Sequence, residues 1–144
     1  HVFLNGNLEN LENFKRHIFE INPNINLHIG KYIPLNINEF NKDNKYLVFS
    51  GIGNHKTFVS MLKDYGINVV KDIEFPDHYK YTNYDINKII DLSNDLDYKI
   101  ITTEKDYLRL DRDKIDNINF IKSELKILDE DKLISTILKK DENN

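Results

Sequence analysis

Two adjacent ionisable residues, Asp77 and His78, lie between an apolar run at residues 67–75 and a helix-start signal at Thr82. The apolar run is typical of a buried strand, so the pair follows the end of that strand. Open α/β sheets bind their ligands beyond the carboxyl ends of their strands. Histidine titrates near neutral pH and can relay a proton or orient a carboxylate that removes one. We interpret His78 and Asp77 as candidate catalytic residues; the alternative is an imidazole that only hydrogen-bonds a neighbouring loop.

Two other apolar runs also end in polar turns. The turn after residues 46–49 contains Ser50, Gly51, Gly53 and Asn54, and the turn after residues 99–101 contains Thr103, Glu104, Lys105 and Asp106. Because glycines permit close backbone approach and helix N-termini attract anions, the first turn is a candidate phosphate or substrate loop. In the second turn, a cation near a helix start is mildly unfavourable, so Lys105 indicates a ligand or an ion pair. The alternatives are a plain capped turn and a helix start stabilised by acids. Neither turn is a complete dinucleotide fingerprint or a P-loop.

The surrounding sequence predicts strands that alternate with helices. The pattern gives strands at residues 46–49, 67–75, 98–101 and 118–121, with helix caps at Asn54, Thr82, Thr103 and Asp129. This alternation predicts an α/β fold, a mainly parallel, Rossmann-like sheet flanked by helices. Thr82 and Asp85 form a capping-box pattern, and Gly66 suits a helix stop. The last helix is expected to face inward with its apolar residues Leu133, Ile134, Ile137 and Leu138.

The first 44 residues give a weaker pattern. A strand at residues 2–4, an amphipathic helix from Leu8 to Ile21 and an extended segment at residues 27–33 are expected. Residues 27–44 are interpreted as a possible interlobe linker or long connection within a single domain over residues 1–144. Since a strand-like run opens the chain without an initiator Met, we expect a longer protein to precede it.

The composition limits the function classes. The chain has 144 residues, a formal charge of −4 and no cysteine. This charge argues against a nucleic-acid partner, and the missing cysteines exclude disulfides and thiolate metal sites. No apolar run approaches the roughly 20 residues that span a bilayer. The remaining histidines lack metal-ligand spacing and are interpreted as surface or incidental: His1, His17, His28 and His55.

Three segments resemble one protein family in order and spacing. FSGIGN (49–54), FPDHYKYT (75–82) and TTEKDYLRL (102–110) are similar to the C-terminal half of tetraacyldisaccharide 4'-kinase, the lipid A 4'-kinase. That family commonly has proline after Gly-Asn, where this chain has His55. Because proline at the first helical position mainly pre-sets the backbone, we expect this difference to have little functional consequence.

The resemblance implies an ATP-dependent kinase of lipid A biosynthesis. It would transfer the γ-phosphate to the 4' position of a tetraacylated glucosamine disaccharide at the cytoplasmic face of the Gram-negative inner membrane. Such kinases have two lobes, and the N-terminal, P-loop-type lobe holds ATP and Mg²⁺. This sequence has no Gly-Lys-Ser/Thr loop and therefore resembles the C-terminal lobe alone. That lobe is expected to be soluble and inactive by itself, with the N-terminal lobe and the lipid A precursor as its partners.

The resemblance also suggests roles for individual residues. His78 matches the family histidine that pairs with a catalytic Asp of the other lobe, and Asp77 would hold His78 or line the cleft. The residues of the two polar turns match motifs that face the nucleotide and the interlobe cleft. Two other functions remain open at this point: a non-catalytic α/β module that binds a protein partner or small anion, and a lobe of another nucleotide-sugar enzyme.

Overall fold

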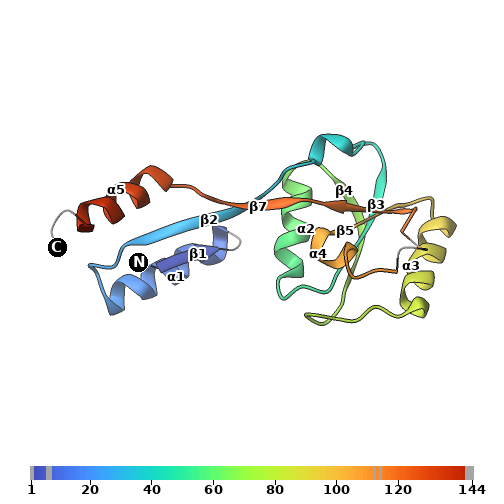
Figure 1. Cartoon of the computed structure of the whole chain (residues 1–144), viewed down its shortest axis with the longest axis horizontal. Helices are drawn as coiled ribbons and strands as arrows, with labels where there is room; N and C mark the ends of the chain where they lie inside the picture. Colours follow the sequence, from blue (N-terminus) through green and yellow to red (C-terminus); the bar gives the residue numbers. More distant parts are fainter. Residues whose placement is uncertain (1, 6–7, 112, 114, 142–144) are drawn as a thin grey trace. The chain divides into compact units, whose positions relative to one another are not determined.

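The structure is a computed structural model that describes residues 2–5, 8–111, 113 and 115–141 (Figure 1). Its backbone forms two compact units. The terminal unit comprises His1–Ile33 and Glu124–Asn144, and the central unit comprises Pro34–Ser123. The single domain expected over residues 1–144 stays a prediction. The division after Ile33 lies inside the 27–44 segment and within a strand that covers Leu27–Pro34. A polar linker, which usually marks a domain boundary, is therefore not found at that point.

The central unit contains a four-stranded parallel sheet in the order β4-β3-β5-β6. Its strands are β3 (Lys45–Ser50), β4 (Asn68–Glu74), β5 (Lys99–Thr103) and β6 (Ile118–Ile121). The connections contain α2 (His55–Asp64), α3 (Asn83–Asp95) and the short α4 (Glu104–Tyr107), and a 3-10 turn, η1 (Ile37–Glu39), precedes β3. The α/β prediction is confirmed. Because β3 pairs with both β4 and β5, the strand order reverses there, which is where such sheets bind ligands.

The side chains of β3 alternate between two hydrophobic layers. Tyr46 and Val48 pack with α2, whereas Leu47 and Phe49 pack with α3. Each of these side chains is at most 2% exposed. Figure 1 accordingly shows α2 and α3 on opposite sides of the sheet. A sheet buried on both faces holds its strand ends rigidly, as a functional site requires.

The predicted helix signals of the central unit are confirmed by their hydrogen bonds. Thr82 and Asp85 form a reciprocal capping box, with Asp85 N donating to Thr82 Oγ1 at 3.2 Å and Thr82 N donating to Asp85 Oδ2 at 2.9 Å. Asn54 caps α2 by accepting from Thr57 N at 3.3 Å. Gly66 has φ 86°, a left-handed value that glycine adopts without steric cost. These local signals fix where α2 ends and where α2 and α3 begin.

The terminal unit contains β1 (Val2–Asn5), α1 (Leu8–Ile21), β2 (Leu27–Pro34), β7 (Ser123–Ile127) and α5 (Glu130–Asp141). The strand order is β1-β2-β7, and β1 is parallel to β2. Among the described residues, no helix is long and apolar enough to cross a bilayer. The expected inward face of α5 is wrong for three of its four residues: only Leu133 is buried (8% exposed), while Ile134, Ile137 and Leu138 are 46–58% exposed.

Candidate functional site

The segments that follow β3, β4 and β5 meet in one place, which we call the strand-end cluster (residues 50–54, 75–79 and 103–109). Gly51 N donates to Asp106 Oδ2 at 3.0 Å and joins the first segment to the third. His78 N donates to Gly51 O at 3.0 Å and joins the second to the first. Arg109 Nη2 lies 3.2 Å from His78 Nδ1 and joins the third to the second. The prediction that these strand ends come together is confirmed.

Gly51 is at the centre of this cluster and has no room for a side chain. A Cβ there would lie 3.0 Å from the Tyr81 hydroxyl and 3.2 Å from both Pro76 O and Tyr79 Cβ. The space that the missing side chain leaves beside Gly51 is therefore filled by other residues of the protein and not by a ligand. Gly53 differs, because it is exposed and a Cβ there would first meet Asp77 Oδ2 at an ordinary 3.5 Å. Of the two glycines, Gly53 is the one that another molecule can reach.

Asp106 holds the cluster together with a fully buried carboxylate. Besides the Gly51 amide, it accepts from Thr103 Oγ1 at 2.7 Å and from Arg109 Nη1 at 3.4 Å. Thr103 Oγ1 in turn accepts from Asp106 N at 3.1 Å and caps α4. A buried carboxylate is tolerated only when donors surround it, as they do here. Asp106 and Thr103 thus face the interior, whereas Glu104 and Lys105 next to them are exposed.

Tyr81 packs against the strand-end cluster beside Gly51. Among the described residues, its buried hydroxyl has no hydrogen-bond partner. Burial and the nearby Asp106 carboxylate raise the pKa of Tyr81 far above its usual value, so the phenol stays neutral. Its ring contacts those of Phe49, Phe75 and Tyr79, with centroids 5.1–5.5 Å away. This aromatic wall supports the loops that carry the exposed residues.

The predicted catalytic pair lies on the outer side of the cluster. The His78 and Asp77 side chains are 70% and 49% exposed, and His78 Nε2 is 3.8 Å from Asp77 Oδ2. His78 has φ 59°, a left-handed backbone that costs a non-glycine residue about 1 kcal/mol. Two hydrogen bonds from its amide, to Gly51 O and to Asp77 Oδ1 at 3.0 Å, maintain that conformation. Backbone strain of this kind concentrates at functional sites.

Two other histidines are buried, so their interpretation as surface residues is wrong. His55 is 1% exposed; its Nδ1 is 2.7 Å from Ser50 Oγ and its Nε2 is 3.0 Å from Asp72 Oδ2. His28 is also 1% exposed and lies 3.0 Å from Asp129. Only His17 is exposed as expected, and His1 lies outside the described residues. The sequence did hold a signal for His55, since it continues the apolar stripe of α2 at helical spacing: Phe58, Val59 and Leu62.

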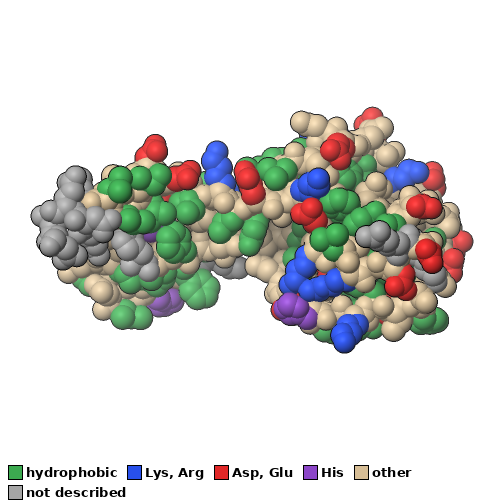
Figure 2. Space-filling model, in the orientation of Figure 1, with side chains coloured by type: hydrophobic (Ala, Val, Ile, Leu, Met, Phe, Trp, Pro, Cys, Tyr) green, Lys and Arg blue, Asp and Glu red, His purple; other side chains and the backbone are tan. Residues whose placement is uncertain are grey.

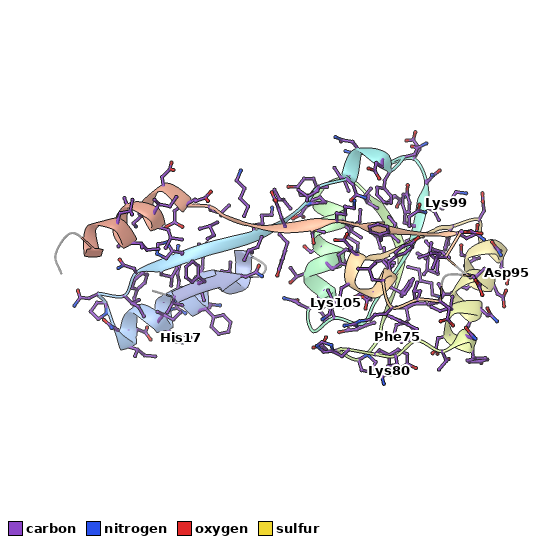
Figure 3. The ribbon with its side chains drawn as sticks, in the orientation of Figure 1. His17, Phe75, Lys80, Asp95, Lys99 and Lys105 are labelled. Carbon is purple, nitrogen blue, oxygen red and sulfur yellow. The ribbon has the colours of Figure 1, made fainter. Side chains whose placement is uncertain are left out.

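The structure thus separates the predicted cofactor-binding residues into two groups. Those that are buried hold the loops: Ser50, Gly51, Thr103 and Asp106. Those that are exposed remain available to a ligand: Gly53, Asn54, Glu104 and Lys105. Figure 2 shows Lys and Arg side chains close to a histidine on this face, and Figure 3 places Lys105 and Lys80 there. In the described ranges no group of three His, Cys, Asp or Glu is placed to hold a metal ion.

Comparison with known proteins places this arrangement in a family context. The sequence matches the family described as tetraacyldisaccharide-1-P 4'-kinase (LpxK) over residues 7–142. The tetraacyldisaccharide 4'-kinase of Pelagibacter ubique (strain HTCC1062) is 54% identical over 143 residues, which are 99% of this chain and 46% of the relative. The enzyme of that name from Rickettsia akari (strain Hartford) is 39% identical over 72% of this chain and 31% of the relative. The chain therefore spans less than half the length of these relatives.

A solved structure is also similar. It is described as the "apo" form of LpxK from Aquifex aeolicus in complex with ATP. The similarity covers 95% of this chain and 50% of that one, at 20% identity and a TM-score of 0.47.

Proposed function

This chain belongs to the tetraacyldisaccharide-1-P 4'-kinase family, and we propose that it is the C-terminal part of such a kinase. The whole enzyme would transfer the γ-phosphate of ATP to the 4'-hydroxyl of a tetraacylated disaccharide 1-phosphate. In that reaction the 4'-oxygen bonds to the γ-phosphorus, the bond to the β-phosphate oxygen breaks, and a carboxylate takes the hydroxyl proton. Catalysis of phosphoryl transfer depends mainly on positioning and on neutralising charge.

The family relationship and the contents of this chain support a division of labour. The sequence has no Gly-Lys-Ser/Thr loop, and within the described ranges no metal-binding cluster is present. We therefore assign the holding of the triphosphate and of Mg²⁺ to the other lobe of the enzyme. This chain would contribute the strand-end cluster, which faces the bound nucleotide and sugar.

His78 is the residue of this cluster best placed to act on bound substrate. Its ring is exposed, while its backbone is tied to Gly51 at the strand switch point. In the proposed reaction it donates a hydrogen bond to the carboxylate that removes the proton and so fixes that carboxylate's orientation. Asp77 Oδ2 lies 3.8 Å from Nε2 of the ring. The exposed residues of the cluster would contact nucleotide or sugar: Gly53, Asn54, Glu104 and Lys105.

The partner of this chain would be the N-terminal lobe of the same protein. The terminal unit leaves several large apolar side chains exposed, including Phe14 (61%), Ile21 (85%) and Leu138 (58%). Exposed apolar side chains gathered on one unit are typical of a surface that another part of a protein covers. We place the assembled enzyme at the cytoplasmic face of the inner membrane, where its lipid substrate would be.

The single observation that carries the proposal is the convergence of three family motifs on His78 and Gly51. The test is an assay of ATP-dependent phosphorylation of tetraacyldisaccharide 1-phosphate by the complete gene product that contains this sequence. His78→Ala should lower kcat by about 10²- to 10⁴-fold, because the carboxylate that removes the proton loses the hydrogen bond that orients it. His17→Ala, an exposed histidine in the terminal unit, is the matched control and should leave the rate unchanged. A parent protein without this activity would overturn the proposed function, and an active His78→Ala enzyme would remove His78 from it.

A further inference from the structure

Arg109 joins the buried centre of the strand-end cluster to its exposed histidine. One end of the guanidinium, Nη1, lies 3.4 Å from the buried Asp106 Oδ1, and the other, Nη2, lies 3.2 Å from His78 Nδ1. The Arg109 side chain is 28% exposed, and Asp106 is not exposed at all. The Arg109 guanidinium thus connects the His78 ring to the buried Asp106 carboxylate, which is fixed by its other hydrogen bonds. Arg109 does not belong to the predicted site residues.

The chemistry of this contact decides which ring nitrogen of His78 carries the proton. A guanidinium has only N–H donors and stays charged in proteins. Nδ1 of His78 must therefore present its lone pair to Arg109. A neutral imidazole has one N–H, so the proton must lie on Nε2. Nε2 is also the nitrogen that points away from Arg109, with Asp77 Oδ2 at 3.8 Å.

We propose that Arg109 is a positioning residue that holds His78 as an Nε2–H donor. The inference rests on the proposed function and makes it more specific. With Nδ1 engaged by Arg109 and Nε2 already protonated, the neutral ring can donate to a carboxylate or phosphoryl oxygen. It cannot accept the proton of the sugar hydroxyl, which must go to a carboxylate. His78 therefore orients the base and is not itself the base.

Local packing shows why such an anchor is needed. The His78 ring is 70% exposed, so neighbouring side chains do little to confine it. Its backbone is fixed by hydrogen bonds from its amide, but these do not set the rotation of the ring or its tautomer. A neutral imidazole free in solution exchanges its proton between both nitrogens. Arg109 removes this freedom with one charge-assisted hydrogen bond.

The first test reads the tautomer directly and needs no activity. Two-bond ¹H–¹⁵N spectra of the ¹⁵N-labelled chain, recorded above the pH at which histidines are charged, distinguish protonated from unprotonated ring nitrogens. The set of imidazole cross-peaks that disappears in the His78→Asn variant is assigned to His78. The parent should show His78 mainly as the Nε2–H form, and Arg109→Met should show both forms. Arg16→Met is the control, because Arg16 is an exposed arginine of α1 that bonds Asn13, and it should leave the His78 signals unchanged.

The result that would overturn the inference is an Nδ1–H form in the parent, or a tautomer ratio that Arg109→Met does not alter. If Arg109→Met does not fold, Arg109→Gln gives the same test, because a side-chain amide can either donate or accept and so does not select one tautomer. The amide signal of Gly51 reports whether the Asp106 contact survives. Retention of this signal together with a changed tautomer ratio supports positioning, whereas an unchanged ratio refutes it.

The second test uses the complete gene product. Arg109→Met should lower kcat by about 10- to 100-fold, the range for groups that orient a reacting histidine, with a smaller change in KM. Arg109→Lys should recover part of the loss. An unchanged kcat in Arg109→Met would refute the inference even if His78→Ala is inactive. Failure of the proposed function would appear separately, as a parent enzyme without kinase activity, and would leave the tautomer result standing.

Discussion

Gly51→Ala tests the packing of the strand-end cluster most sharply. The added Cβ would lie 3.0 Å from the Tyr81 hydroxyl and 3.2 Å from Pro76 O, and overpacking of this kind costs about 1–3 kcal/mol. If the loop shifts to relieve the contact, the 3.0 Å bond from Gly51 N to Asp106 lengthens, and hydrogen bonds to charged groups contribute about 1.5–3 kcal/mol. We therefore expect the free energy of unfolding to fall by about 2–3 kcal/mol, on the scale of either effect.

A double-mutant cycle separates the steric effect from a general loss of stability. Tyr81→Phe removes the nearest atom and a buried hydroxyl that lacks a partner among the described residues, so by itself it should be nearly neutral. Combined with Gly51→Ala, it should recover about 1 kcal/mol, the coupling expected for residues in contact. Urea unfolding followed by circular dichroism measures all four proteins.

Gly53→Ala is the matched control, since its Cβ would meet its nearest neighbour at 3.5 Å. It should change stability by less than about 1 kcal/mol in either direction. Equal stability of Gly51→Ala and Gly53→Ala would refute the claim that the loops pack tightly against Gly51. Strict additivity in the cycle would show that the Tyr81 hydroxyl is not the limiting contact.

Three further outcomes are expected. His55→Ala should destabilise the chain by about 1–3 kcal/mol in urea unfolding, because it leaves the buried Ser50 hydroxyl unpaired; a parent-like midpoint would refute this. Hydrogen bonds from Thr82 lower the pKa of Asp85, so its contribution is present above the unfolded-state pKa and is lost as the pH falls through the lower folded value. Asp85→Asn should therefore lose less stability on acidification than the parent, and parallel pH profiles would contradict this. Finally, the chain alone should show no phosphoryl transfer in the kinase assay, and turnover by it would refute the division of labour between lobes.

Local signals made much of the central unit predictable. The capping box of Thr82, the Asn54 cap and the left-handed Gly66 each depend on residues within a few positions, and all three are present. The meeting of the strand ends also followed from the sequence, because parallel strands place their carboxyl ends at one edge. β7 was missed, since its five residues contain only two apolar side chains, Leu125 and Ile127.

Features that depend on tertiary contacts could not be predicted. Nothing adjacent to Asp106 in the sequence indicates that its carboxylate is buried under the Gly51 amide, or that Arg109 reaches His78 from 31 positions away. No glycine marks the left-handed φ of His78, and the enrichment of histidine in this region is too weak to single out one position. The exposed face of α5 has the same periodicity as a buried one, because the pattern records which residues share a face and not what covers that face.

The two ends of the central unit lie side by side. Leu35 N donates to Lys122 O at 2.8 Å, and the Asn36 side chain accepts from Lys122 N at 2.9 Å and donates to Phe120 O at 3.1 Å. A segment closed in this way can be cut out, rejoined through a short loop and opened at another surface turn without stretching its backbone. Residues 34–123 are therefore a suitable segment for circular permutation or for exchange between related chains.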